Sequence, residues 1–181
     1  MTAQPTSVPI VFLGGTCGGD LWRTPFETAL TTMGVSFFNP QVDDWQPWMA
    51  EEENRCIAHS PVVLMPVLAS TLGLGTLGEV GFSILAVLRS ILAGHNRTLI
   101  TLIDPEADAA CTIKEQIDGA WVTVQASPGI IRESNRMRAL VRSKVATFHH
   151  PNVILVDTLE MMQTTLHQVL EQQEWKQVSN G

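Results

Sequence analysis

The side chain best suited to covalent chemistry in this sequence is Glu79. It follows a glycine-rich stretch, Gly73-Leu74-Gly75-Thr76, and Arg89 is the one other charged residue between Thr76 and Ala93. A carboxylate in the first turn of a helix stays ionised because the helix dipole favours its charge, and an ionised carboxylate is a nucleophile. Thr76-x-x-Glu79 also fits a capping box, so the spacing leaves a capping role open on equal terms.

A second candidate loop, residues 39–48, combines two carboxylates with two indole rings. Asp43 and Asp44 are adjacent, and Trp45 and Trp48 follow them. Indoles offer a flat stacking surface, and a carboxylate hydrogen-bonds to ring nitrogens, so the loop suits a nucleobase. The structural alternative is an aspartate N-cap with tryptophan packed over the sheet edge.

The third candidate loop is Gly14-Gly15-Thr16-Cys17-Gly18-Gly19. Glycines there allow backbone N–H groups to approach a ligand near a helix N-terminus. The loop lacks both the Lys-Ser/Thr ending of a P-loop and the spacing of a dinucleotide fingerprint. A flexible turn, with Cys17 as a small residue that fills it, is the alternative.

Short apolar strands that alternate with helices would bring these loops together. We expect strands at 8–13, 35–38, 62–65, 99–103 and 153–156, and helices at 22–33, 47–58, 76–93, 132–148 and 159–176. Asp20 is the expected N-cap of the first helix, and residues 106–129 should hold a short helix near 113–117 and a strand at 121–124. The pattern predicts one α/β domain over 1–181, with frayed ends at 1–7 and 177–181. Its doubly wound parallel sheet would have the flavodoxin-like or Rossmann-like order 2-1-3-4-5, with ligands at the carboxyl ends of the strands.

Composition narrows the class of function. The net charge of −7 disfavours nucleic-acid binding, and charged residues make up 16% of the 181 residues against about 25% in typical domains. No export signal is visible, and the apolar segment 80–93 is shorter than a bilayer span. Three widely spaced cysteines suit free thiols. We therefore expect a cytoplasmic protein without membrane or nucleic-acid partners. Its low charge and all-round apolar helix at 76–93 favour a homodimer or larger homo-oligomer.

Three segments, in order along the chain, resemble the nucleoside 2-deoxyribosyltransferase superfamily, and in particular its branch with GGT and NP-V-DDW loops. The resemblance covers about residues 8–103. The segments are Leu13-Gly14-Gly15-Thr16-Cys17 with Trp22-Arg23, then Phe38-Asn39-Pro40 with Val42-Asp43-Asp44-Trp45, then Gly75-Thr76-Leu77-Gly78-Glu79-Val80-Gly81.

The resemblance implies cleavage or exchange of the N-glycosidic bond of a nucleoside, without metal or cofactor. Glu79 would attack the anomeric carbon to form a glycosyl ester, and Asp43 or Asp44 would bind and protonate the leaving base. A nucleoside 5′-monophosphate hydrolase and a non-catalytic nucleotide-binding sensor remain alternatives. The implied substrate-binding residues are Gly14, Gly15, Thr16, Cys17, Asn39, Trp45, Gly75 and Thr76.

The chain departs from its relatives at several polar positions. It has no Tyr, and Leu68-Ala69 and Gly73-Leu74 stand where relatives carry aspartates, which leaves the Asp43–Asp44 pair as the acid of the resembling region. Basic residues cluster on the expected helix at 132–148, where a solvated helix flank is favoured over a phosphate site. These are Arg132, Arg136, Arg138, Arg142 and Lys144.

Overall fold

The computed structural model describes residues 7–17, 21–41, 46–117 and 119–172. Its centre is a five-stranded parallel sheet in the order β2-β1-β3-β4-β7. When only the five strands of this sheet are numbered along the chain, their order across the sheet is 2-1-3-4-5. The predicted α/β fold is therefore confirmed. The strands are β1 (Val11–Leu13), β2 (Phe37–Phe38), β3 (Val62–Val67), β4 (Thr98–Ile103) and β7 (Val153–Val156).

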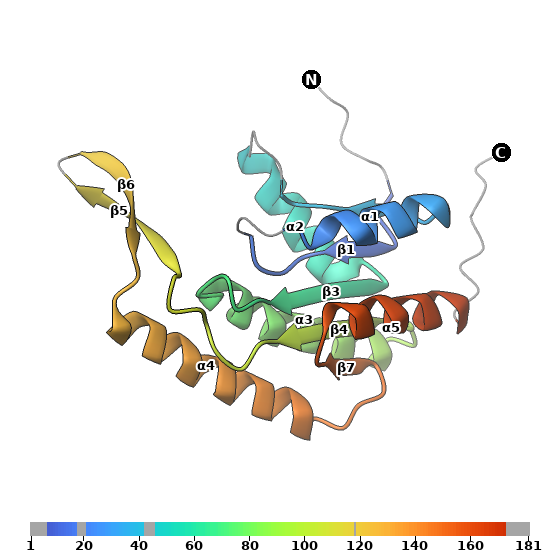
Figure 1. Cartoon of the computed structure of the whole chain (residues 1–181). Coiled ribbons are helices and arrows are strands. Elements are labelled where there is room, and N and C mark those ends of the chain that lie inside the picture. The colour runs from blue at the N-terminus through green and yellow to red at the C-terminus, as the bar shows by residue number, and fades with distance from the viewer. Residues whose placement is uncertain (1–6, 18–20, 42–45, 118, 173–181) are drawn as a thin grey trace.

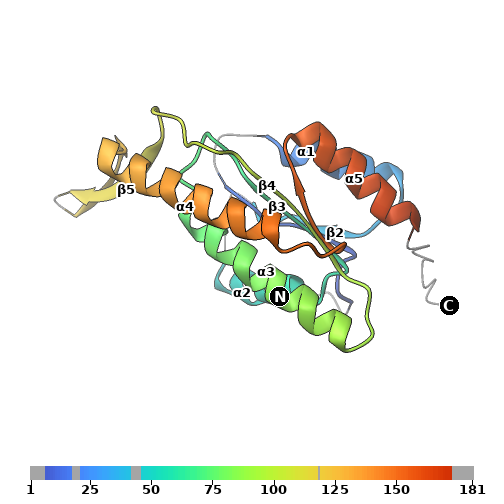
Figure 2. The ribbon, with the colours of Figure 1, turned by 90° about the horizontal axis from the view of Figure 1, so that it is seen from below.

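Helices cover both faces of this sheet (Figures 1 and 2). Alternate strand residues point to opposite layers, so Val11 and Leu13 contact one helical layer while Phe12 contacts the other. Both layers are apolar, which explains why the strands are continuous apolar runs in the sequence. One layer holds α1 (Arg23–Thr32) and α5 (Leu159–Gln172), and the other holds α2 (Pro47–His59), α3 (Leu74–Leu92) and α4 (Pro128–Thr147).

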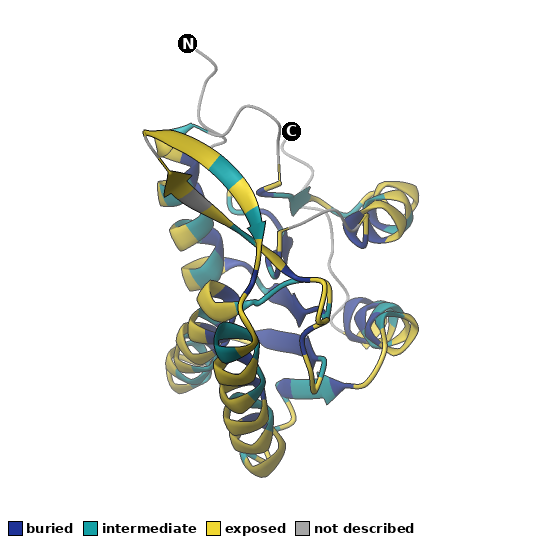
Figure 3. Ribbon diagram, turned by 60° about the vertical axis from the view of Figure 1, so that its left-hand side comes forward, coloured by how far each residue is buried: buried dark blue, intermediate teal, exposed yellow. Residues whose placement is uncertain are grey.

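A two-stranded antiparallel hairpin stands where a helix near 113–117 was expected. It consists of β5 (Thr112–Ile117) and β6 (Ala120–Gln125), and it projects from the body as an arm (Figure 1). The helix prediction is wrong because the β-branched residues of 112–117 pair across the hairpin instead of forming an apolar helical stripe. The strand expected at 121–124 is confirmed as β6. Most of the arm is exposed (Figure 3).

Helix α3 packs against β3 and β4 on one side and leaves an apolar stripe exposed on the other. Phe82 and Leu92 are 67% and 88% exposed, and Leu85 lies between them on the same face. The helix begins at Leu74, so its 19 residues are more than the apolar segment 80–93 that was compared with a bilayer span in the sequence. Within the described ranges it is the one helix long and apolar enough to cross a membrane, which corrects the expectation that the segment is too short.

Candidate active site

A cavity of about 270 Å³ lies at the carboxyl ends of β1, β2 and β3. The strand order reverses between β1 and β3, and ligands of doubly wound sheets bind at that point. Larger hollows exist along the described residues, and one of about 710 Å³ lies beside Pro61 and Arg97, at the amino ends of β3 and β4. The cavity is lined by Phe12, Gly14, Gly15, Thr16, Cys17, Pro40, Glu53, Thr71, Gly73, Leu74, Gly75, Thr76 and Glu79.

Most of the predicted site residues meet in this cavity. The first loop contributes Gly14 to Cys17, and the third contributes Gly75, Thr76 and Glu79. Asn39 does not line it. The Asn39 amide donates to Glu27 Oε1 over 2.8 Å and accepts from the Gln41 backbone N–H over 2.8 Å. Substrate binding by Asn39 therefore stays a prediction without direct support.

Several predicted residues lie outside the described part of the chain. Asp43, Asp44 and Trp45 of the second loop are among them, and so is Asp20, the expected N-cap of α1. The described neighbour Pro40 lines the cavity, so the second loop begins at the cavity wall. The roles predicted for the two aspartates and the indole stay predictions.

The loop after β1 is held in shape by the buried guanidinium of Arg23. Arg23 Nε donates to the Leu13 carbonyl over 2.9 Å, and Nη2 donates to the Gly14 carbonyl over 2.9 Å. Its remaining N–H groups reach the carbonyls of Gly15 and Thr16 and the Gln41 side chain. Arg23, which belongs to α1, thereby supplies hydrogen-bond donors to the backbone carbonyls at and just beyond the end of β1.

Glycine is required at two points of the cavity wall. Gly15 has φ 91°, and a Cβ there would lie 2.6 Å from Pro66 Cδ. Gly73 has φ 63°, and a Cβ there would lie 2.5 Å from Val67 Cγ1. Larger residues would combine a left-handed backbone with a steric clash, so the glycines let the first and third loops approach the end of β3.

A second buried guanidinium, that of Arg138 on α4, holds the loop after β3. Its Nη1 donates to the Val67 and Asp104 carbonyls, each over 3.1 Å, and its Nη2 donates to the Leu68 carbonyl over 2.9 Å and to the Thr71 carbonyl. Arg138 is fully buried, so the expectation of a solvated flank is wrong for this residue. Arg142 also turns inward to the Ile103 carbonyl, whereas Arg136 is largely exposed.

The start of α3 differs from the expected capping box. The N-cap is Gly73 in the left-handed conformation, and no side chain caps the helix. Glu79 consequently lies in the second turn, and the capping role for the Thr76–Glu79 pair is wrong. Burial, followed by the negative charge of Glu53, raises the pKa of the Glu79 carboxyl. This direction is opposite to the one expected from a first-turn position near the helix dipole.

Glu53 is the chemically important residue that sequence reasoning missed. It lies on α2, lines the same cavity as Glu79 and raises the pKa of the Glu79 carboxyl through its charge. In the sequence it is one of three successive glutamates, which resemble a solvated helix face.

The described part of the chain contains no cluster of three His, Cys, Asp or Glu side chains able to hold a metal ion.

Comparison with known families agrees with this geometry. Residues 8–93, a little under half of the chain, match the family model described as "Nucleoside 2-deoxyribosyltransferase like". This part of the chain, from β1 to α3, is therefore similar to the nucleoside 2-deoxyribosyltransferase superfamily, and the similarity suggests a nucleoside-modifying enzyme. Every residue that lines the cavity lies within the match. No curated protein matches the chain.

Replacing Arg138 should destabilise the fold strongly. Arg138→Ala leaves buried carbonyls at the ends of β3 and β4 without donors, so the free energy of unfolding should fall by about 3 kcal/mol or more. Arg136→Ala is the matched control, since Arg136 is exposed and lies 3.8 Å from Glu133 in a weak ion pair. It should change stability by less than about 0.5 kcal/mol in urea denaturation. Equal effects of the two substitutions would contradict the assigned role.

Glu79→Gln should raise the melting temperature at pH 7. The folded-state pKa of Glu79 is raised, so the folded protein loses stability as pH rises through the interval between the unfolded and folded pKa values. A neutral glutamine removes that loss. Melting curves of both proteins should converge below the ordinary glutamate pKa of about 4.3. A lower melting temperature for the variant at pH 7 would show that Glu79 is not under electrostatic strain.

Proposed function

We propose that this protein cleaves or exchanges the N-glycosidic bond of a nucleoside, with 2′-deoxyribonucleosides as the first substrates to test, through a glycosyl ester on Glu79. The observation that carries the proposal is the position of Glu79 in a glycine-walled cavity at the strand-order reversal, within the segment that matches the family. Asp43 or Asp44 would bind the leaving base, as the sequence resemblance implies.

The surroundings of Glu79 suit displacement at an anomeric carbon. The transition state of glycosidic cleavage carries positive charge on the sugar, and a carboxylate in a partly desolvated cavity stabilises that charge more than it would in water. The raised pKa of Glu79 means that its carboxylate is more basic than an ordinary glutamate. Two successive displacements at the same carbon would return the sugar with its original configuration.

The charge of the cavity favours a nucleoside over a nucleotide. None of the described lining residues is Lys or Arg. The nearby Arg23 and Arg138 direct their N–H groups at backbone carbonyls and at Gln41, Cys17 and Ser134. Residues 18–20 and 42–45 also contain no basic residue. A 5′-phosphate would therefore meet carboxylates without a cation to compensate, which disfavours the 5′-monophosphate alternative.

Glu79→Ala should abolish turnover while leaving the fold intact. Removal of a nucleophile is expected to cost about 10³-fold or more in rate, and Glu79 does not cap α3. The assay incubates labelled nucleosides with the protein, with and without a second free base. Base exchange would indicate a transferase, release of free sugar would indicate a hydrolase, and binding without product would indicate a sensor.

Two controls make this assay decisive. Glu51→Gln, an exposed position on α2, should behave as wild type, and circular dichroism should show native structure for Glu79→Ala. Near wild-type turnover in folded Glu79→Ala would contradict the mechanism.

We also infer that the exposed stripe of α3 is covered by a second copy of the chain. The stripe consists of Phe82, Leu85 and Leu92 and carries Arg89 as its one charge. Helix α4 packs beside α3 (Figure 2), and it carries two further exposed apolar residues, Met137 and Leu140. An exposed patch of this kind is typical of an interface, and homodimers with a two-fold axis are the commonest assemblies.

Sedimentation at micromolar concentration should therefore show a species heavier than the 19.8 kDa chain. Leu85→Glu should shift it to the monomer, because the substitution places a charge in the centre of the stripe. Met161→Glu, at an exposed position on α5 in the opposite layer, should leave it unchanged. A wild-type monomer would contradict the assembly, and flotation of that monomer with lipid vesicles would assign the stripe to a membrane instead.

A further inference from the structure

Two carboxylates from neighbouring helices share the cavity, although the sequence resemblance supplies a role for only one. Glu53 comes from α2 and Glu79 comes from α3, and the two helices pack against each other on the same face of the sheet. Enzymes that cleave glycosidic bonds with retention require a nucleophile and a separate group that gives and takes a proton. The described cavity therefore contains side chains for both tasks.

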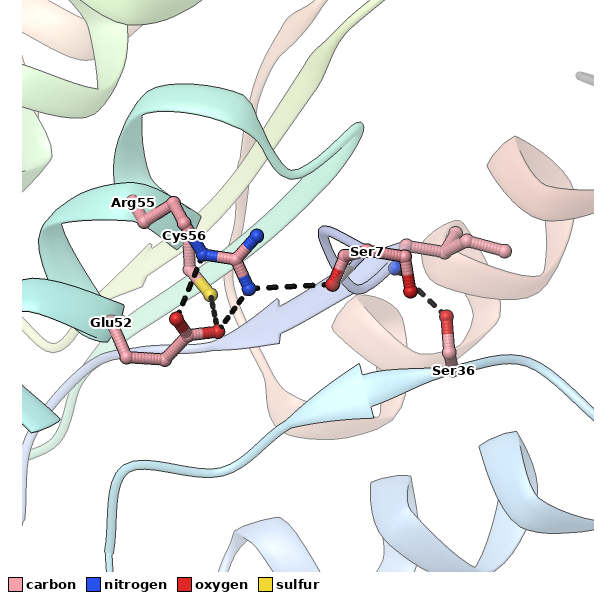
Figure 4. A network of polar contacts seen from close by, with 6 residues as sticks. Ser7, Ser36, Glu52, Arg55 and Cys56 are labelled. Carbon is pink, nitrogen blue, oxygen red and sulfur yellow. Dashed lines mark hydrogen bonds and ion pairs between the residues drawn. The ribbon is translucent and has the colours of Figure 1, made fainter. Parts of the chain in front are cut away.

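The rotation of α2 about its axis is set by its buried face, which consists of Met49, Glu52 and Cys56. Glu52 is buried, and its carboxylate accepts from Arg55 Nε over 2.7 Å and from the Cys56 thiol over 3.8 Å (Figure 4). Arg55 also donates to the Ser7 carbonyl ahead of β1. Burial raises the pKa of the Cys56 thiol to about 12, so the thiol keeps the proton that it donates.

This orientation of α2 directs Glu53 at the cavity. Successive residues of an α-helix are turned by about 100°, so a helix that buries Glu52 presents the neighbours of Glu52 in other directions. Glu51 is exposed to solvent, whereas Glu53 is half-buried and lines the cavity wall. Three successive glutamates thus have three different environments, and only the third reaches the site.

The two carboxyl groups are electrostatically coupled. The charge of Glu53 contributes to the raised pKa of Glu79, after the larger effect of burial. A proton on Glu53 would remove that contribution and so favour the ionised form of Glu79 that attack requires. A proton-carrying Glu53 is therefore compatible with an ionised nucleophile in the same cavity.

We propose that Glu53 is the acid–base catalyst of the glycosidic reaction, a role that rests on the proposed function of Glu79. In the first step a Glu79 carboxylate oxygen bonds to the anomeric carbon, the bond from that carbon to the base nitrogen breaks, and the Glu53 carboxyl gives its proton to the base. In the second step water or an incoming base attacks the same carbon, the ester bond to Glu79 breaks, and the Glu53 carboxylate takes the proton from the attacking group.

The test compares leaving groups in Glu53→Gln, which preserves side-chain shape. With an unmodified purine nucleoside the rate should fall by about 10²- to 10⁴-fold, because proton donation to the base is lost. With an N7-methylated purine nucleoside, whose cationic base leaves without a proton, the fall should be less than about 10-fold. Azide, which needs no base to activate it, should then accelerate breakdown of the glycosyl ester in the variant. Glu51→Gln on the same helix should match wild type with both substrates.

Each contrary outcome has a separate meaning. A leaving-group-independent loss in Glu53→Gln, or a loss that depends on the leaving group in Asp43→Asn or Asp44→Asn instead, would overturn the role of Glu53 while the function of Glu79 stands. Failure of wild-type protein to form product or ester with either nucleoside would overturn the proposed function itself, and the role of Glu53 with it.

Discussion

Unpaired carbonyl groups at the carboxyl ends of the parallel strands are the constraint on which the site depends. A parallel sheet ends in backbone acceptors, and burying them without donors is costly. Here one guanidinium on each side of the sheet meets the requirement, Arg23 from α1 at the end of β1 and Arg138 from α4 at the ends of β3 and β4. These hydrogen bonds fix the two loops between which the cavity opens.

The same arrangement determines the charge of the cavity. Because the guanidiniums face backbone carbonyls and lie behind the loops, the described lining consists of glycines, a few small or apolar residues and two carboxylates. Such a site is poorly suited to phosphate but well suited to a sugar that develops positive charge during bond cleavage. The buried face of α2, formed by Met49, Glu52 and Cys56, turns the second carboxylate, Glu53, toward this lining from outside the two loops.

The sheet could be predicted from the sequence because buried parallel strands are short apolar runs, and each of the five expected runs became a strand. The helix predicted near 113–117 was wrong, although Asp118-Gly119 between the runs 112–117 and 120–124, which are both rich in β-branched residues, is a hairpin signal. The nucleophile candidate was found through its glycine loop. Glu53 and Arg138 were missed because their types resemble a solvated helix face, and only the rotation of α2 and α4 in the folded protein shows that they point inward.

The central claim is that a covalent glycosyl ester forms on Glu79. Peptide mapping by mass spectrometry after acid quench of the protein with a nucleoside substrate tests it most directly. With a 2′-deoxyribonucleoside, the account predicts the mass of one 2-deoxypentosyl group on the peptide that contains Glu79, and the absence of this mass when Glu79 is replaced by alanine. Product formation without any adduct, or an adduct on a peptide that lacks Glu79, would contradict the account.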